Sequence, residues 1–303
     1  MNTKVKKALI LILIGTGIAF AVLSSGRSGE ERGGETKILF VGDIMLDRTL
    51  RKIGESRGYD HLFSCAKDYL AGFDLVVGNL EGPVTFHDSI SLETVPGEPG
   101  NTTFTFSKGA IEALSGAGVG LVSLGNNHIW DFGREGVEST KALLRESGIA
   151  HFGDPIGDIS ATVVKGGNRL SFVGFNQFLG ENDPQKTIDA IWKARRSSDL
   201  VAVYAHWGDE YLPANEYQKA LAHRFIDAGA DLVVGSHPHI VQESEVYAGK
   251  PIYYSLGNFI FDQYWTEEVR VGGGLEVSLV QGDIAVKERR FDIGRDGRTC
   301  VKE

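Results

Sequence analysis

Residues 38–47 read ILFVGDIMLD, an apolar run that ends in small residues and is followed at once by polar side chains able to bind metal. The same arrangement recurs further along the chain. The recurrences are DLVVGNLEG (74–82), GLVSLGNNHIWD (120–131), LVAVYAHWGDE (200–210) and DLVVGSHPH (231–239). In an α/β sheet, ligands gather outside the carboxyl ends of parallel strands. The pattern therefore predicts a single site at which five strand ends converge.

The apolar runs lack the clean alternation of half-exposed strands, which is typical of parallel strands buried on both faces. We expect strands at residues 38–41, 75–77, 119–124, 200–205 and 232–234. Helical patterns separate them, at residues 61–70, 108–116, 134–147, 186–196 and 216–228. Short β segments with glycine-rich turns follow residue 239. This order of elements predicts an α/β sandwich with mixed sheets.

The composition of the 303-residue chain is that of an ordinary globular protein, with 42% hydrophobic and 23% charged residues. We expect one large domain over residues 37–295, because nothing in the chain repeats. The formal net charge is −9. This charge argues against a nucleic-acid partner, since no basic face is evident that would neutralise a phosphate backbone.

The first 23 residues differ from the rest of the chain. Lysines at positions 4, 6 and 7 precede an apolar run at residues 8–23, and a polar segment follows at residues 24–36. This pattern is typical of a signal peptide or an uncleaved membrane anchor. The run is slightly long for a cleaved signal, which favours an anchor. The domain would then lie on the extracytoplasmic face, or be secreted if the segment is cleaved.

The chain contains two cysteines, Cys65 and Cys300. In an exported protein they could form a disulfide, and two unpaired thiols are an equally supported interpretation. Neither cysteine has the spacing of a zinc site.

Polar residues follow the first two predicted strands. Asp43 comes directly after Gly42, which allows close backbone approach, and its carboxylate can bind a hard or borderline cation. The alternative is an aspartate that caps the next helix. Glu81 can bridge two cations, and Asn79 can bind metal or donate hydrogen bonds. Arg48 can bind an anionic oxygen, and a surface arginine is the alternative.

The third predicted strand ends in Asn126, Asn127 and His128, and Asp131 follows three residues after the histidine. Adjacent asparagines are costly to bury unless they are hydrogen-bonded or coordinated, which indicates a polar site. His128 beside Asp131 is typical of an oriented imidazole that gives or takes a proton. A turn with a helix cap is the alternative interpretation.

Histidines end the fourth and fifth predicted strands. His206 follows the run LVAVYA, and Glu210 is a candidate partner that fixes the orientation of its imidazole. His237 and His239 flank Pro238. Alternate residues of extended backbone point in opposite directions, so the two histidines serve two metals, or one metal through a bent turn.

Six motifs between residues 37 and 291 carry a resemblance to a known family, and in chain order they are GDIMLDR, GNLEG, GNNHIWDFG, HWGDEY, GSHPHIVQ and SLGNFIFDQ. They resemble the CapA capsule-synthesis family, whose relatives include the PgsA component of poly-γ-glutamate synthesis. That family is similar to the calcineurin-like metallophosphoesterases. The resemblance implies a four-layer α/β/β/α sandwich of the metallo-dependent phosphatase type. It also implies one or two divalent metal ions, of Mn, Zn or Fe.

The resemblance also assigns roles to residues. The implied metal ligands are Asp43, Glu81, Asn127, His206, His237 and His239. Of these, Asp43 and His239 would serve the first ion and Glu81 would bridge, while the remaining three would surround the second ion. His128, oriented by Asp131, would protonate a leaving oxygen, and Arg48 would bind a substrate oxyanion.

One residue departs from the family pattern. Met45 stands where the usual Asp-x-His motif has its histidine, and a thioether is a poor ligand for Mn or Zn. Two functions follow from the resemblance. The first is a metal-dependent hydrolase of a phosphoester, or less directly of an amide, in an anionic envelope polymer or its precursor. The second is a non-catalytic accessory of a membrane complex, with other polymer-synthesis subunits, which binds the polymer. Met45 favours the second slightly.

Overall fold

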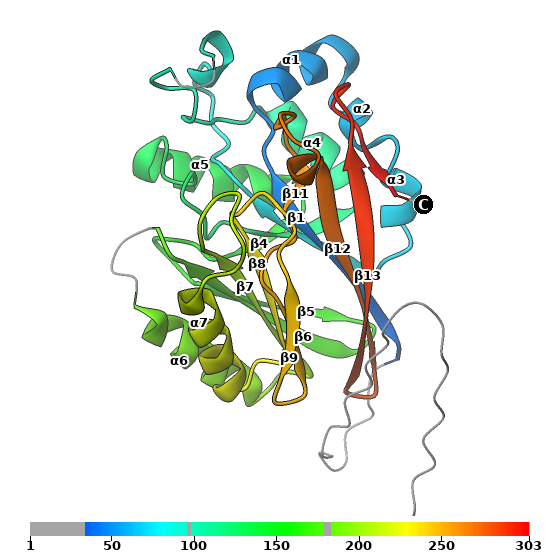
Figure 1. Ribbon diagram of the computed structural model, residues 1–303. Helices are drawn as coiled ribbons and strands as arrows, with labels where there is room; N and C mark the ends of the chain where they lie inside the picture. Colours follow the sequence, from blue (N-terminus) through cyan, green and yellow to red (C-terminus); the bar gives the residue numbers. More distant parts are fainter. Residues whose placement is uncertain (1–33, 96–97, 179–182, 303) are drawn as a thin grey trace, which may run out of the picture.

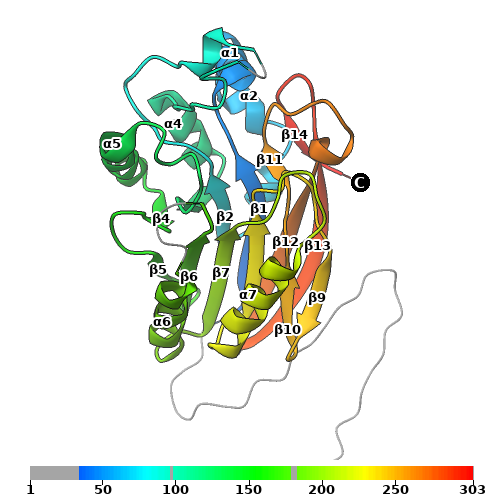
Figure 2. The same cartoon turned by 60° about the vertical axis from the view of Figure 1, so that its left-hand side comes forward.

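The computed structural model describes residues 34–95, 98–178 and 183–302. Two β-sheets pack face to face and helices cover the outer face of each, which gives the layer order α/β/β/α (Figures 1 and 2). The predicted four-layer sandwich is therefore confirmed. The predicted N-terminal membrane segment lies outside the described residues. Within the described ranges, every helix is too short or too polar to cross a membrane.

The first sheet combines central parallel strands with an antiparallel edge. Its main strands, in spatial order, are β14 (Thr299–Val301), β13 (Asp283–Ile293), β12 (Val271–Val280), β1 (Thr36–Ile44), β2 (Leu75–Leu80), β3 (Val119–Ser123) and β4 (Ala150–Phe152). The short strand β11 (Asn258–Ile260) pairs in parallel with the carboxyl end of β1. The three predicted strands of this sheet are confirmed, each with boundaries shifted by a few residues.

The second sheet contains the two other predicted strands and four further ones. In spatial order its strands are β5 (Ser160–Lys165), β6 (Asn168–Asn176), β7 (Leu200–His206), β8 (Leu232–Ser236), β10 (Lys250–Tyr253) and β9 (Ser244–Tyr247). Strand β6 is parallel to β7 and buried along most of its length, and it was not among the predicted strands. Its apolar residues are interrupted by Ser171 and Gly174, which weakens the pattern of a buried strand.

Helices close both outer faces. The first sheet is covered by α1 (Arg48–Arg57), α2 (Asp60–Phe63), α3 (Lys67–Leu70), α4 (Lys108–Gly116) and α5 (Gly133–Glu146), and the second by α6 (Pro184–Arg195) and α7 (Glu216–Asp227). The predicted helix at residues 61–70 is two short helices, and α1 was not predicted. Figure 2 shows α6 and α7 side by side against the second sheet. The Asn215 side chain caps α7 by accepting from the Gln218 amide.

Strand β1 shows why the layers stack in this way. Leu39 and Val41 pack in the apolar layer between the first sheet and its helices, whereas Ile38 and Phe40 pack in the layer between the two sheets. Side chains alternate across a strand, so a strand with apolar residues at every position must be covered on both faces. The continuous apolar run at residues 38–41 therefore explains why both faces of β1 are buried.

A disulfide joins Cys65 to Cys300, with the two Cα atoms 4.8 Å apart. This settles the alternative that the sequence left open. Cys65 lies between α2 and α3, and Cys300 lies in β14, so the bridge ties the C-terminal edge strand to the helical layer. Figure 1 shows the C-terminal end beside α3.

Candidate metal centre

The five predicted strand ends meet where the carboxyl edges of the two sheets face each other. Asn79 at the end of β2 donates to Asp43 Oδ1 of β1 at 2.8 Å and lies 3.3 Å from His206 Nδ1 of β7. The backbone amide of His237, just beyond β8, donates to Asp43 Oδ2 at 3.1 Å. His206 Nε2 lies 2.8 Å from the Oδ1 atom of Asn127, which follows β3. The predicted convergence is confirmed, and it spans both sheets.

Three of these side chains form a closed group. Asp43, Glu81 and His239 each offer a ligand atom within 4.8 Å of the others, and all three are buried. His239 Nδ1 lies 3.6 Å from Asp43 Oδ2, and His239 Nε2 lies 3.8 Å from Glu81 Oε1. Glu81 Oε1 is fully buried and has no hydrogen-bond partner among the described residues. A buried carboxylate oxygen without a donor is costly, so the group fits a bound cation.

Burial decides the protonation of this group. Desolvation raises the pKa of Asp43 to about 6, and desolvation together with the Asp43 charge raises the pKa of Glu81 well above its usual value. Desolvation lowers the pKa of His239 to about 3 and that of His237 to about 4, and it lowers the pKa of His206. The imidazoles are therefore neutral at pH 7, which is the form that binds metal.

The second half of the site contains His206, His237 and Asn127. The rings of His206 and His237 lie 4.8 Å apart, and the Nδ1 atom of His237 is buried without a described partner. His206 Nδ1 lies 3.0 Å from Ser236 Oγ. The prediction that Glu210 orients His206 is wrong, because Ser236 contacts the Nδ1 atom of His206 and Glu210 lies near His239 instead.

The His-Pro-His segment is a bent turn rather than an extended strand end. His237 and His239 have φ angles of 95° and 58°, in the left-handed region that non-glycine residues rarely adopt. The Tyr211 amide donates to the Pro238 carbonyl at 2.9 Å, which holds the turn against the loop that follows β7. Such backbone strain is found where surrounding structure over-determines it, often at functional sites.

Three asparagines hold this arrangement through hydrogen bonds, and for Asn79 the structure selects hydrogen bonding over metal binding. Asn79 directs its amide nitrogen toward Asp43 and receives a hydrogen bond on Oδ1 from Asn126, so it orients a ligand and does not offer its own oxygen. Asn126 also accepts from the amides of His128 and Ile129. Asn258 lies 3.0 Å from His239 Nδ1. The amide side chains therefore form a supporting frame around the carboxylates and imidazoles.

Gly42 lets the chain close in at this edge, as its position after the first strand predicted. A Cβ atom at Gly42 would lie 1.9 Å from the Gly257 carbonyl oxygen, and that same oxygen accepts the Asp43 amide at 2.9 Å. Any larger residue would push β1 away from the segment that carries Asn258.

His128 and Asp131 lie beside the metal-ligand group. His128 Nδ1 is 3.0 Å from Asp131 Oδ2, and that oxygen also accepts the Phe104 amide at 2.7 Å. The Phe104 ring packs on the imidazole with centroids 4.3 Å apart. Asp131 therefore sets the orientation of the ring, with Nε2 left for a proton transfer. The catalytic role itself stays a prediction.

Arg48 also packs against Phe104. Its guanidinium pairs with Asp262 and lies 5.1 Å from the Phe104 ring centroid and 5.5 Å from that of Phe261. The residue is largely buried and has a φ angle of 51°. A substrate oxyanion bound to Arg48 would share the guanidinium group with the Asp262 carboxylate.

Met45 does not replace the missing histidine. Its side chain is fully buried in the apolar layer under the helices, and its sulfur accepts the Asp47 amide at 3.0 Å. Position 45 thus contributes packing to that layer, and its thioether is a poor ligand for Mn or Zn.

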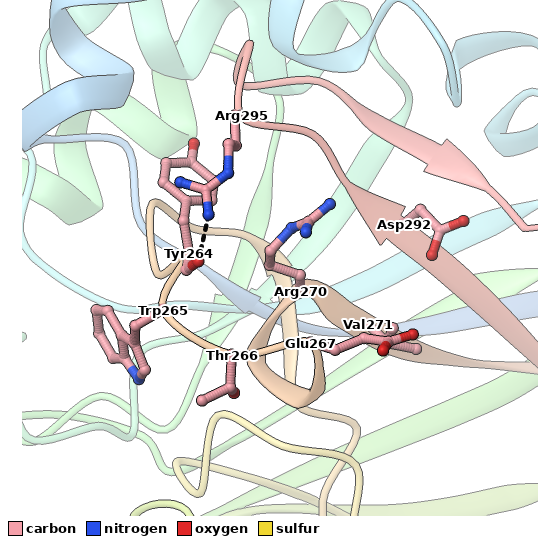
Figure 3. A pocket seen from close by; sticks show the side chains of 8 residues that line it. All are labelled: Tyr264, Trp265, Thr266, Glu267, Arg270, Val271, Asp292 and Arg295. Carbon is pink, nitrogen blue, oxygen red and sulfur yellow. Dashed lines mark hydrogen bonds between the residues drawn. The ribbon is translucent and has the colours of Figure 1, made fainter.

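A cavity of about 300 Å³ opens beside the segment that follows Asp262. Figure 3 shows its lining, with the guanidinium groups of Arg270 and Arg295 facing it and Trp265 at its side. A row of ring contacts runs from the cavity wall to the metal centre: Trp265 packs on Tyr211 and Tyr211 packs on His239, with centroid distances of 5.9 and 6.0 Å.

Comparison with known proteins places the motifs in a family. Residues 37–263 match the model described as Bacterial capsule synthesis protein PGA_cap. The chain is 33% identical over 254 residues to the PGA biosynthesis protein CapA of Bacillus subtilis (strain 168), which covers 75% of this chain and 63% of that protein. It is also 33% identical to the capsule biosynthesis protein CapA of Bacillus anthracis, with 75% and 60% covered. The chain therefore spans less than two thirds of the length of these relatives.

A solved structure shares the fold. A hypothetical protein from Thermus thermophilus superposes with a TM-score of 0.55 over 84% of this chain and 99% of that chain. The two sequences are 20% identical, so this likeness concerns the fold alone.

Proposed function

Since the chain belongs to the bacterial capsule synthesis family PGA_cap, we propose that it acts in the synthesis or export of a capsule polymer or poly-γ-glutamate. Its proposed activity is metal-dependent hydrolysis of a phosphoester within an anionic envelope polymer or its precursor. The observation that carries this proposal is the buried group of Asp43, Glu81 and His239, in which Glu81 Oε1 has no hydrogen-bond donor within the described part of the chain.

The donor set suits Mn, Zn or Fe. Carboxylate oxygens and neutral imidazoles together match borderline divalent cations. The first ion would be held by Asp43, Glu81 and His239, as their mutual approach supports. A second would be held by Glu81 and the side chains near it at the ends of β3, β7 and β8, which are Asn127, His206 and His237.

A bound divalent cation supplies a water of lowered pKa and stabilises negative charge that develops on a phosphoryl oxygen. The side chains of the protein orient the ligands, transfer the proton and bind the substrate. Asn79 and the His237 amide hold the Asp43 carboxylate in place. His128, oriented by Asp131, delivers a proton to the leaving oxygen. Arg48 binds an anionic oxygen of the substrate with the part of its guanidinium that Asp262 leaves available.

The proposed location is the extracytoplasmic face of the membrane, with residues 1–23 as the anchor. The Cys65–Cys300 disulfide supports this location, because disulfides persist in oxidising compartments and are rare in the cytosol.

The experiment is metal analysis of the full-length chain purified in detergent, followed by turnover of bis(p-nitrophenyl) phosphate with Mn²⁺, Zn²⁺ or Fe²⁺ added. We expect bound metal that is lost in His239→Ala and reduced in His206→Ala and His237→Ala, with turnover that EDTA abolishes. The exposed His87 provides the control variant His87→Ala. A chain without bound metal, or metal content that survives the three substitutions, contradicts the proposal.

An accessory role without catalysis is the second candidate, and the cavity in Figure 3 favours it. Arg270 and Arg295 line this cavity beside the carboxylates of Glu267 and Asp292, and Trp265 at its side is exposed. The two guanidinium groups are the side chains that would pair with an anionic chain here. In this role the metal centre and the cavity together would hold the polymer for other synthesis subunits. Binding of polyglutamate that Arg270→Ala and Arg295→Ala weaken, together with no turnover by the metal-loaded protein, would favour this role over hydrolysis.

A further inference from the structure

Among the residues that the structure describes, the first ion position lacks one donor of the family pattern. Asp43, Glu81 and His239 supply three ligand atoms, and Met45, which stands at the fourth position of the family pattern, is buried in the apolar layer. Three protein donors leave a divalent cation with open coordination positions on its solvent side. Any further protein ligand must therefore come from a side chain that reaches the group from outside the core.

Glu210 occupies that side. Its Oε1 atom lies 4.0 Å from His239 Nε2, and this same nitrogen lies 3.8 Å from Glu81 Oε1. His239 Nδ1 is engaged by Asn258, so Nε2 is the nitrogen left to bind a cation. Carboxylates of Glu81 and Glu210 thus approach the one available nitrogen of His239 together.

The exposure of the two glutamates differs. The Glu81 side chain is fully buried, whereas that of Glu210 is 46% exposed. Glu210 therefore approaches His239 from the solvent side, whereas Glu81 approaches it from the protein interior. The loop that carries it is fixed to the His-Pro-His turn by the hydrogen bond from the Tyr211 amide to the Pro238 carbonyl. Glu210 and His239 are consequently held as neighbours by backbone as well as by side chains.

We propose that Glu210 is a further ligand of the metal held by Asp43, Glu81 and His239. Its carboxylate takes the place of the histidine that the family pattern has at position 45. This inference rests on the proposed metal binding at that group. Three carboxylates and one imidazole form a donor set rich in oxygen, which favours Mn²⁺ over softer ions. The Oε1 atom of buried Glu81, which has no partner among residues 34–95, 98–178 and 183–302, is the independent observation that a cation belongs at this position.

The test is titration of Mn²⁺ alone into the full-length chain in detergent, followed by calorimetry and by the electron paramagnetic resonance signal of free Mn²⁺. We expect Glu210→Gln to weaken Mn²⁺ binding by about 10- to 100-fold, in the range found when a supporting or ligating side chain is lost. Glu210→Asp keeps the charge and shortens the reach, and it should weaken binding to an intermediate degree. The control is Glu216→Gln, which removes the same charge from a side chain that is 93% exposed.

Each outcome has a distinct meaning. If Glu210→Gln binds Mn²⁺ as tightly as Glu216→Gln, or if Glu210→Asp matches the unaltered chain, Glu210 is not a ligand. If the unaltered chain itself binds no Mn²⁺, or binds it equally well in His239→Ala, then the metal centre has failed and not Glu210 alone. Circular dichroism of each variant separates loss of binding from loss of fold.

Discussion

His239 Nδ1 lies 3.0 Å from Asn258 Oδ1, and the Asn258 amide nitrogen donates to Gln263 Oε1 and to the Val269 carbonyl. Because that nitrogen is committed as a donor, Asn258 Oδ1 must accept, and His239 carries its proton on Nδ1. The lone pair on His239 Nε2 then faces Glu81. A residue outside the ligand set thus decides which imidazole nitrogen can bind metal.

Replacement of Asn258 by leucine should therefore weaken Mn²⁺ binding by about 10- to 100-fold, because His239 loses the acceptor that fixes its tautomer. Calorimetric titration measures this change. Asn101→Leu is the matched control, since it removes a buried asparagine that binds Thr94 away from the centre. Equal affinities of the two variants would show that Asn258 does not orient His239.

Metal binding should weaken in acid because of the carboxylates and not because of the histidines. The pKa of Asp43 is raised to about 6, so protons compete with a cation as the pH falls through 6, whereas His237 and His239 titrate only near 4 and 3. In the metal-free chain, folding raises the pKa of Asp43 from 3.8 to about 6, so the folded state binds the proton more tightly than the unfolded state. The contribution of Asp43 to the free energy of unfolding is therefore full below pH 3.8 and is lost as the pH rises through about 6.

Mn²⁺ should accordingly raise the melting temperature more at pH 7.5 than at pH 5, where protonated carboxylates already relieve the buried charge. Thermal unfolding with Mn²⁺ and with EDTA at the two pH values measures the difference. His239→Ala should show a much smaller Mn²⁺ effect at both. A larger Mn²⁺ effect at pH 5 would contradict this account of Asp43 and Glu81.

Met45→Leu should leave Mn²⁺ affinity within about twofold, because the thioether packs in the apolar layer and donates nothing to the cation. The cost in the free energy of unfolding should stay below about 1.5 kcal/mol, as for other swaps that conserve volume. Calorimetry and urea denaturation measure the two quantities. A loss of affinity as large as that of His239→Ala would identify the sulfur as a ligand.

His128→Ala should lower phosphodiester turnover by about 10²- to 10⁴-fold, the usual contribution of a positioned general acid, while metal content stays the same. His87→Ala, which alters an exposed histidine paired with Glu135, should retain full turnover. Steady-state kinetics and metal analysis on the same preparations measure both effects. Full turnover by His128→Ala would remove this histidine from the mechanism.

Loss of the Cys65–Cys300 disulfide should lower the free energy of unfolding by about 2–5 kcal/mol, because the bridge restricts a long loop of the unfolded chain. The double substitution to serine, measured by urea denaturation, should match the unaltered chain in dithiothreitol and should itself be insensitive to dithiothreitol. A double variant of unchanged stability would contradict a stabilising role for the bridge.

Much of the architecture was predictable because the signal is local. Continuous apolar runs predicted the five parallel strands, and the polar residues directly after them predicted a shared site, since strand ends in α/β sheets meet at one edge. The strand β6 escaped detection because Ser171 and Gly174 interrupt its apolar pattern. Helix α1 escaped because only Leu50, Arg51 and Gly54 are buried in it, which leaves a weak apolar face.

By itself, then, the sequence determined the sandwich class and the residue types at the site, since both follow from patterns of neighbouring residues. Only the tertiary structure decided which side chains contact one another. It placed Glu210 beside His239 instead of His206, gave Asn79 and Asn258 supporting roles, turned Met45 into the core and joined Cys65 to Cys300. The residues in these contacts lie far apart in the chain, and their distances depend on how strands pair and layers pack, which no local pattern encodes.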